Sequence, residues 1–267
     1  MNRFFKYAAS SHQSLLRDNS KHIFAMNNAL QIYSARAIYS LIPKNACSSL
    51  RLSLAMANGC LRDPKDFGWI HQNTDTFRTN LASALTAEYT FIVLRCPYAR
   101  LASVYLDKIV GHLPVANQFY DITNKRCEVS EMSFDFFIRN LRFKHIREVD
   151  SHWRPQVDFL LYEEYDDYFC LEDFANVPEI LQKKIQLKVI DARQLTQHGI
   201  DKVTMLGEPG EYTQSSAIQI MRLKQAGQCP SPLSLYTDEL ADMVRTNYAD
   251  DIALYQSLFG TDKLMFS

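Results

Sequence analysis

The chain has 267 residues, of which 47 % are hydrophobic and 22 % are charged, and its formal net charge is −1. This length and composition indicate an ordinary globular protein with a substantial buried core, most simply one domain over residues 1–267. The near-neutral charge provides no basic field of the kind that long-range nucleic-acid binding requires, so we expect no nucleic-acid partner.

The spacing of the cysteines and the length of the apolar runs exclude further classes of protein. The 6 cysteines are scattered, with no C-x-x-C pair and no histidine at zinc-ligand spacing, so we expect reduced thiols and no metal site. The segment before Ser10 lacks the sustained apolar core of a signal peptide. No run approaches the roughly 18 apolar residues that a membrane span needs. We therefore expect a cytoplasmic protein without a transmembrane segment.

The first clear pattern, after a short helix and an early strand expected within residues 12–36, is a strand, a loop and a helix. Residues 37–42 form a short apolar run that a proline ends, as is typical of a buried strand. A helix is predicted from Ser48 or Ser49 onward, where helix formers dominate. The intervening residues 44–49 contain one lysine, two serines and no bulky side chain. Backbone N–H groups at a helix N-terminus, a lysine and hydroxyls can together hold an anionic group such as phosphate or sulfate.

A second strand and helix follow after a turn-rich connection. Residues 89–94 are an almost continuous apolar run, as expected of a strand buried on both faces of a parallel sheet. Pro97 suits the first turn of the next helix, whose apolar residues recur at helical spacing. Arg95 should therefore leave the end of the strand, and Ser103 should lie about two turns into the helix.

The chain from residue 111 onward mixes loops, helices and further strands. Prolines and asparagines indicate loops at 111–132, whereas Ser133 is a suitable N-cap for a helix that reaches Leu141. The acidic run at 163–167 is predicted to be an exposed connection and not a metal site. Beyond the acidic run we predict strands at 168–171 and 188–190, helices at 177–187 and 236–259, and a loop at 204–214.

Three segments resemble motifs of one enzyme family. Residues 43–51, Pro-Lys-Asn-Ala-Cys-Ser-Ser-Leu-Arg, lack the spacing of an ordinary nucleotide triphosphate loop but resemble the 5′-phosphosulfate loop of sulfotransferases. Residues 95–108 resemble the 3′-phosphate motif of the same family, with Cys96 in place of the usual acidic residue, a position that is not a phosphate ligand in the pattern. Residues 151–156, Ser-His-Trp-Arg-Pro-Gln, resemble the His-Trp-x-Pro segment of the carbohydrate branch, both Golgi-type and bacterial family 2.

The resemblance implies an enzyme that uses 3′-phosphoadenosine 5′-phosphosulfate (PAPS) as sulfuryl donor, without a metal. Its acceptor would be a hydroxyl, and the carbohydrate motif favours a glycan or a glycolipid. The implied fold is a P-loop-like, three-layer α/β fold with a mainly parallel central sheet flanked by helices. The donor-binding residues implied by the motifs are Lys44, Asn45, Ala46, Cys47, Ser48, Ser49, Arg95 and Ser103.

The resemblance also implies roles in the reaction. Lys44 would stabilise the charge that develops on the bridging oxygen as the sulfuryl group leaves. The general base would be His71, which lies between the two donor motifs, or His152 of the His-Trp-x-Pro segment. We favour His71, although a surface or structural histidine is an equal alternative there. Arg154 is a candidate contact to an anionic acceptor or to the donor, and Glu128 or Asp150 would be the base if neither histidine is.

Within the single domain, residues 37–110 would bind the donor, residues 111–160 and 200–235 would cover donor and acceptor, and residues 236–259 would form a C-terminal helix that packs on the core.

Two other functions stay open for the anion-binding loop. A small-molecule P-loop kinase would select ATP, and a non-catalytic nucleotide-binding module would turn over no acceptor. Animal Golgi enzymes with these motifs usually begin with a membrane anchor, so a bacterial-type enzyme or a trimmed chain is expected here.

Overall fold

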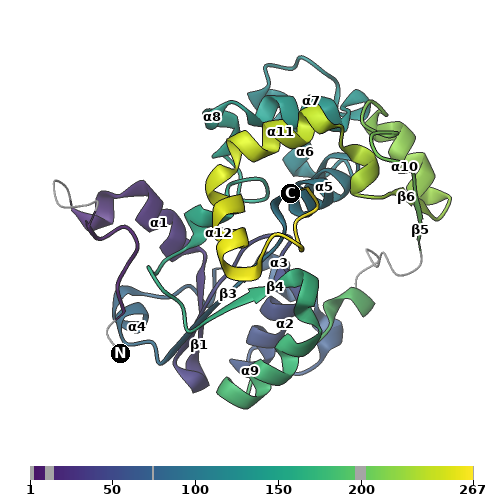
Figure 1. Cartoon of the computed structure of the whole chain (residues 1–267). Coiled ribbons are helices and arrows are strands. Elements are labelled where there is room, and N and C mark those ends of the chain that lie inside the picture. Colours follow the sequence, from purple (N-terminus) through teal and green to yellow (C-terminus); the bar gives the residue numbers. More distant parts are fainter. Residues whose placement is uncertain (1–2, 10–14, 74, 196–202, 267) are drawn as a thin grey trace. The chain divides into compact units, whose positions relative to one another are not determined.

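The computed structural model of the chain describes residues 3–9, 15–73, 75–195 and 203–266. The chain divides into two compact units (Figure 1). Unit 1 consists of Met1–Leu94 and Gln156–His198, and unit 2 consists of Arg95–Pro155 and Gly199–Ser267. That the whole chain acts as a single domain stays a prediction.

Unit 1 is built on a four-stranded sheet in the order β1-β2-β3-β4 (Figure 1). Its strands are β1 (Ala29–Ile32), β2 (Ala37–Ser40), β3 (Tyr89–Leu94) and β4 (Asp167–Cys170). The pairs β2–β3 and β3–β4 are parallel, and β1 is antiparallel to β2. The prediction of an α/β protein with a mainly parallel sheet is therefore confirmed, and the strand predicted at 89–94 has the predicted bounds.

One face of this sheet carries a hydrophobic core. The helices of unit 1 are α1 (Ser20–Asn27), α2 (Cys47–Ala57), α3 (Trp69–Gln72), α4 (Leu81–Leu85) and α9 (Val177–Ile185). Tyr39 of β2 and Phe91 of β3 stack with their ring centroids 5.0 Å apart and pack in one cluster with apolar side chains of α2 and α9. Because alternate strand residues point to opposite faces, the neighbours Ile38 and Ile92 lie on the other face.

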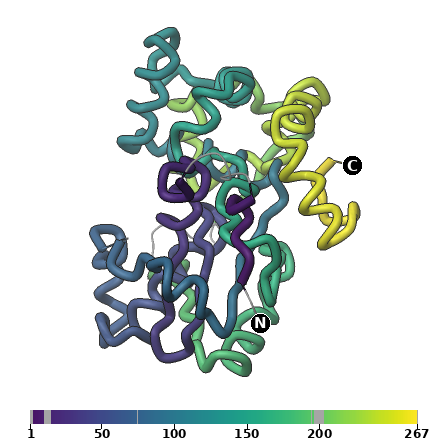
Figure 2. Tube along the Cα trace, turned by 90° about the vertical axis from the view of Figure 1, so that its left-hand side faces the viewer, coloured from purple at the N-terminus to yellow at the C-terminus, as the bar shows by residue number. Residues whose placement is uncertain are grey.

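The chain that enters β4 contacts the N-terminal segment, β2 and α1, and α1 and β1 confirm the short helix and early strand predicted within residues 12–36. Phe5 and Tyr162 form an antiparallel bridge, so the N-terminal segment runs beside the chain that enters β4 (Figure 2). The hydroxyl of Ser40, at the end of β2, lies 2.6 Å from the hydroxyl of the buried Tyr165. Phe24 of α1 packs edge-on against Phe159 with ring centroids 4.8 Å apart.

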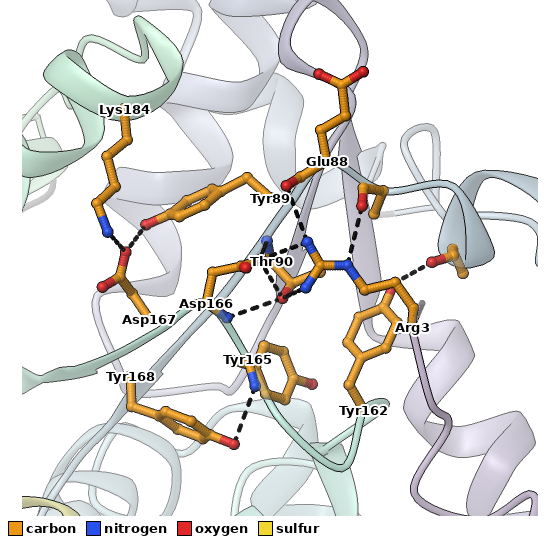
Figure 3. A network of polar contacts seen from close by, with 12 residues as sticks. Arg3, Glu88, Tyr89, Thr90, Tyr162, Tyr165, Asp166, Asp167, Tyr168 and Lys184 are labelled. Carbon is orange, nitrogen blue, oxygen red and sulfur yellow. Dashed lines mark hydrogen bonds and ion pairs between the residues drawn. The ribbon is translucent and has the colours of Figure 1, made fainter. Parts of the chain in front are cut away.

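Arg3, whose side chain is only 7 % exposed, anchors the N-terminal segment at β3 and at the two residues before it (Figure 3). The guanidinium of Arg3 donates hydrogen bonds to the carbonyls of Ala87 and Glu88 and pairs with the carboxylate of Asp166 at 2.7 Å. Burial by itself raises the pKa of Asp166, but hydrogen bonds from Arg3 and Thr90 outweigh it and hold this pKa below its ordinary value.

The next carboxylate, Asp167, accepts a hydrogen bond from the Tyr89 hydroxyl and pairs with Lys184 of α9. The acidic run is thus a connection held by ion pairs. Within the described residues, no group of three or more histidine, cysteine, aspartate or glutamate side chains is arranged to hold a metal ion.

Unit 2 is mainly helical. Its helices are α5 (Pro97–Val104), which continues as a π-helical turn (Tyr105–Ile109), α6 (Pro114–Ile122), α7 (Phe134–Leu141), α8 (Lys144–Arg147), α10 (Ala217–Gln225), α11 (Asp238–Asn247) and α12 (Ala249–Phe259). Strands β5 (Thr204–Leu206) and β6 (Gln228–Pro230) form a short parallel pair. Arg139 of α7 bonds Glu239 of α11, and these two helices lie side by side (Figure 1).

Two predictions for unit 2 are wrong. Residues 111–132 are not only loops, because α6 forms with Pro114 at its first turn and buries Ala116 and Phe119 on one face. Residues 236–259 are not one helix, because the backbone leaves the helical region at Tyr248, with φ −120° and ψ 30°. The buried Tyr248 hydroxyl donates to the carbonyl of Trp153 at 2.7 Å, which fixes this residue between the two helices.

The strand predicted at 188–190 is also absent, since no described residue pairs with these residues in a sheet. The backbone N–H of Ile190 donates to the hydroxyl of Ser53 in α2 instead. The predicted 204–214 loop contains β5 at its start. The N-cap predicted at Ser133 is confirmed, because its side chain accepts a backbone N–H of the first turn, and Thr237 caps α11 in the same way. Among the described residues, every helix is too short or too polar to cross a lipid bilayer.

Candidate active site

The predicted anion-binding loop connects β2 to α2 in unit 1. Lys44 and Ala46 both adopt left-handed backbone conformations, with φ angles of 72° and 56°, while Asn45 between them does not. Such conformations are uncommon for residues other than glycine and cost roughly 1–2 kcal/mol each. Alternating left-handed and right-handed residues direct successive N–H groups to one side and form a concave anion site. The loop therefore stores strain in a shape suited to an anion.

The first turn of α2 adds donors to this loop. Ala46 is the N-cap and supplies no side-chain acceptor. No described residue accepts a hydrogen bond from the backbone N–H groups of Cys47, Ser48 or Ser49. These groups lie at the positive end of the helix dipole, where an anion is favoured. Lys44 and Ser48 are half-buried, so both side chains are partly exposed to solvent.

The side chain of Asn45 bonds other parts of unit 1. Its side chain is fully buried, and its amide nitrogen donates to the carbonyl of Val93 at 2.8 Å and to the Gln156 Oε1 at 2.7 Å. Its own backbone N–H closes a turn on the carbonyl of Ile42. Asn45 thus fastens the loop to the carboxyl end of β3 and holds its strained backbone in place.

Ser49 is also engaged by the protein. Its hydroxyl oxygen accepts the backbone N–H of Ala192 at 3.0 Å. One turn later, the hydroxyl of Ser53 accepts the backbone N–H of Ile190 at 2.8 Å. Two serines of α2 therefore bind the segment after α9, which explains why residues 188–190 do not pair as a strand. Sequence reasoning did not single out Ser53.

His71 lies in the short helix α3 of unit 1 and is exposed. Its ring packs edge-on against Phe67, with ring centroids 5.1 Å apart. The carbonyl of the preceding residue, Ile70, accepts a hydrogen bond from the guanidinium of Arg51 in α2. The last residue of the phosphosulfate-loop motif, Arg51, therefore links the helix after the anion-binding loop to the helix that carries His71.

The remaining predicted residues belong to unit 2. Strand β3 ends at Leu94 and α5 begins at Pro97, so the predicted order of strand, Arg95 and helix is confirmed. Arg95 directly precedes the N-cap of α5 and is half-buried, and Ser103 lies in the last turn of α5 with its side chain partly exposed. The predicted donor-binding residues are thus contributed by both units.

The second arginine of the 3′-phosphate motif has a structural role that the sequence did not reveal. Arg100 is fully buried and donates to the carbonyls of Ser151 at 3.0 Å and Arg154 at 2.8 Å. The indole of the buried Trp153 donates to the carbonyl of Ile146 at 2.8 Å. Arg100 of the 3′-phosphate motif therefore holds the backbone of the His-Trp-x-Pro segment, and the two motifs are in direct contact within unit 2.

His152 lies in this fixed segment and contacts a carboxylate. Its Nδ1 is 2.7 Å from Oδ1 of Asp150, and its backbone N–H donates to the same oxygen at 2.8 Å. Burial by itself raises the pKa of Asp150, but the hydrogen bonds and charge of His152, together with the charge of Lys108, hold this pKa below its ordinary value. The Arg154 guanidinium donates to the Glu148 carbonyl at 2.7 Å, and its role toward an anionic ligand stays a prediction.

Comparison with known proteins identifies the family. A family model described as "Sulfotransferase family" matches residues 33–256, which include the anion-binding loop, the 3′-phosphate motif and the His-Trp-x-Pro segment. No curated protein and no solved structure gives a significant match. Since the family match extends over most of the chain, the protein belongs to the sulfotransferase family.

Proposed function

We propose that the protein transfers a sulfuryl group from PAPS to the hydroxyl of a glycan or glycolipid, as an enzyme nearest the carbohydrate branch of the family. The observation that carries this proposal is the strained loop at residues 44–46 followed by three α2 N–H groups that no described residue accepts. Family membership and the P-loop-like fold expected with it support the same function.

The residues present fit PAPS, the sulfuryl donor. N–H groups at a helix N-terminus, the Lys44 ammonium and the Ser48 hydroxyl are all hydrogen-bond donors, as the 5′-phosphosulfate requires. Arg95 and Ser103 would hold the 3′-phosphate, with arginine suited to a bidentate contact. PAPS supplies the activated sulfuryl group, whose bond to the 5′-phosphate oxygen is the one that breaks. The protein groups that would bind PAPS are cations and hydrogen-bond donors, and this binding needs no metal.

In the reaction, the protein positions the reactants and stabilises charge. A histidine Nε2 accepts the proton of the acceptor hydroxyl as the hydroxyl oxygen forms its bond to sulfur. Lys44 stabilises the negative charge on the phosphate oxygen that keeps the electron pair of the broken bond. Both His71 and His152 stay candidates for the base. The carboxylate contact of His152 adds support for it that the sequence alone did not provide.

Calorimetry on the Arg95→Ala variant tests this function. Adenosine 3′,5′-bisphosphate should bind wild type more tightly than adenosine 5′-phosphate or ATP, and the variant should lose roughly 2–4 kcal/mol of bisphosphate binding, the range for a charge-assisted contact. Binding of adenosine 5′-phosphate should change much less. Arg62→Ala, at an exposed site of unit 1, is the matched control and should bind like wild type. Equal losses for both nucleotides, or a preference for ATP, would contradict the proposal and favour a kinase.

A further inference from the structure

We propose that Asp150 is a positioning residue that holds His152 in the tautomer with hydrogen on Nδ1, which leaves Nε2 as the proton acceptor. This inference rests on the proposed function only for its catalytic consequence. The tautomer itself follows from contacts within unit 2.

One carboxylate oxygen contacts two nitrogens of the same residue. Oδ1 of Asp150 lies 2.8 Å from the backbone nitrogen of His152 and 2.7 Å from its ring Nδ1. An ionised carboxylate can only accept hydrogen bonds, so the contact at Nδ1 requires a hydrogen on that nitrogen. A neutral imidazole carries a single N–H, and Nε2 then keeps its lone pair. Asp150 is mostly buried, with 14 % of its side chain exposed, while 23 % of the His152 side chain is exposed.

The backbone around this pair is held on several sides. Arg154 N–H closes a turn on the carbonyl of Asp150 at 3.0 Å. Arg100 donates to the carbonyls of Ser151 and Arg154, on both sides of His152. These contacts hold the backbone on which both side chains stand, including the peptide group between Ser151 and His152.

A positive charge near Asp150 comes from Lys108, in the π-helical turn after α5. Lys108 and Asp107 form an ion pair at 3.0 Å, and the positive charge of Lys108 lowers the pKa of Asp150. Asp150 therefore keeps its negative charge at neutral pH.

The tautomer can be measured without turnover. Protein labelled with ¹⁵N at histidine is examined by long-range ¹H–¹⁵N correlation at about pH 8.5, where an ordinary imidazole is neutral. The His152 signals are assigned by their loss in His152→Ala. In wild type we expect hydrogen on Nδ1 and none on Nε2. Asp150→Asn should move the population toward the Nε2–H form, because an asparagine amide can donate to Nδ1.

Asp121→Asn is the matched control, since this aspartate of α6 is exposed and pairs with the equally exposed Lys125 at 4.0 Å. It should leave the His152 signals unchanged. Hydrogen on Nε2 in wild type, or identical tautomers in wild type and Asp150→Asn, would overturn the inference. The wild-type measurement tests the tautomer of His152 even if Asp150→Asn fails to fold.

Kinetic measurements distinguish a role of Asp150 in positioning His152 from a role in folding the protein. With radiolabelled PAPS and a panel of glycan acceptors, Asp150→Asn should lower kcat on the order of 10²-fold, within the range that a general base contributes. The KM for the acceptor and the affinity for adenosine 3′,5′-bisphosphate should change little. A loss confined to KM would overturn the positioning role. If wild type sulfates no acceptor, the proposed function fails, whereas the tautomer measurement still stands.

Discussion

Replacing Asn45 by alanine tests whether this side chain supports the loop or binds the donor directly. The change removes two buried hydrogen bonds, to the carbonyl of Val93 at 2.8 Å and to Gln156 at 2.7 Å. Each bond contributes about 0.5–1.5 kcal/mol net, and an acceptor left buried without a donor costs about 1–3 kcal/mol. We expect the free energy of unfolding to fall by about 2–4 kcal/mol, because both buried acceptors lose the donor that Asn45 provides.

The assay is denaturation by urea, together with calorimetric titration of adenosine 3′,5′-bisphosphate. Affinity should fall as well, because without Asn45 the left-handed backbone at Lys44 and Ala46 can relax. Ser48→Ala is the matched control within the loop, and it should change stability by less than about 0.5 kcal/mol because its hydroxyl has no described partner. An Asn45→Ala variant that unfolds at the wild-type urea concentration and loses only affinity would refute the anchoring role.

Three further predictions concern the reaction and the effect of pH. Lys44→Ala should lower turnover by about 10²–10³ and affinity for the bisphosphate much less, and a loss of affinity alone would make the lysine a simple anchor. Alanine at the true base, His71 or His152, should cost about 10²–10⁴ in turnover, and near-normal turnover in both variants would exclude both histidines. Because the pKa of Asp166 is lowered in the folded protein, its stabilising effect is present above the unfolded pKa of about 3.9 and is lost as pH falls through the folded value. Acid unfolding should therefore begin below about pH 4, and Asp166→Asn should weaken its pH dependence while lowering stability at neutral pH; an unchanged acid transition would contradict this.

The sheet could be predicted from the sequence because buried parallel strands form continuous apolar runs. Residues 89–94 show this directly, and all of them are buried. The prediction of loops at 111–132 is wrong because Pro114 does not break the chain but begins α6 at its first turn. The interruption at Tyr248 could not be predicted, because it depends on a hydrogen bond to Trp153, a residue distant in the sequence.

For the candidate site, the motifs identified the positions but not what each side chain contacts. The loop at 44–49 and the helix after Arg95 were located correctly from residue types and spacing. The bonds of Asn45 to β3 and of Arg100 to the His152 segment could not be inferred, because they join residues about 50 positions apart. The partner of His152 is only two residues away, and an Asp-x-His spacing is the signal that could have indicated it.

Sulfuryl transfer itself is measured by following the label from ³⁵S-labelled PAPS into a panel of glycans, glycolipids and phenols, without added metal. We expect label to enter a hydroxyl of a glycan or glycolipid, adenosine 3′,5′-bisphosphate to be released in equal amount, and γ-labelled ATP to transfer nothing. Transfer of phosphate from ATP, or no transfer of sulfur to any acceptor by protein that binds the bisphosphate, would contradict the proposed function.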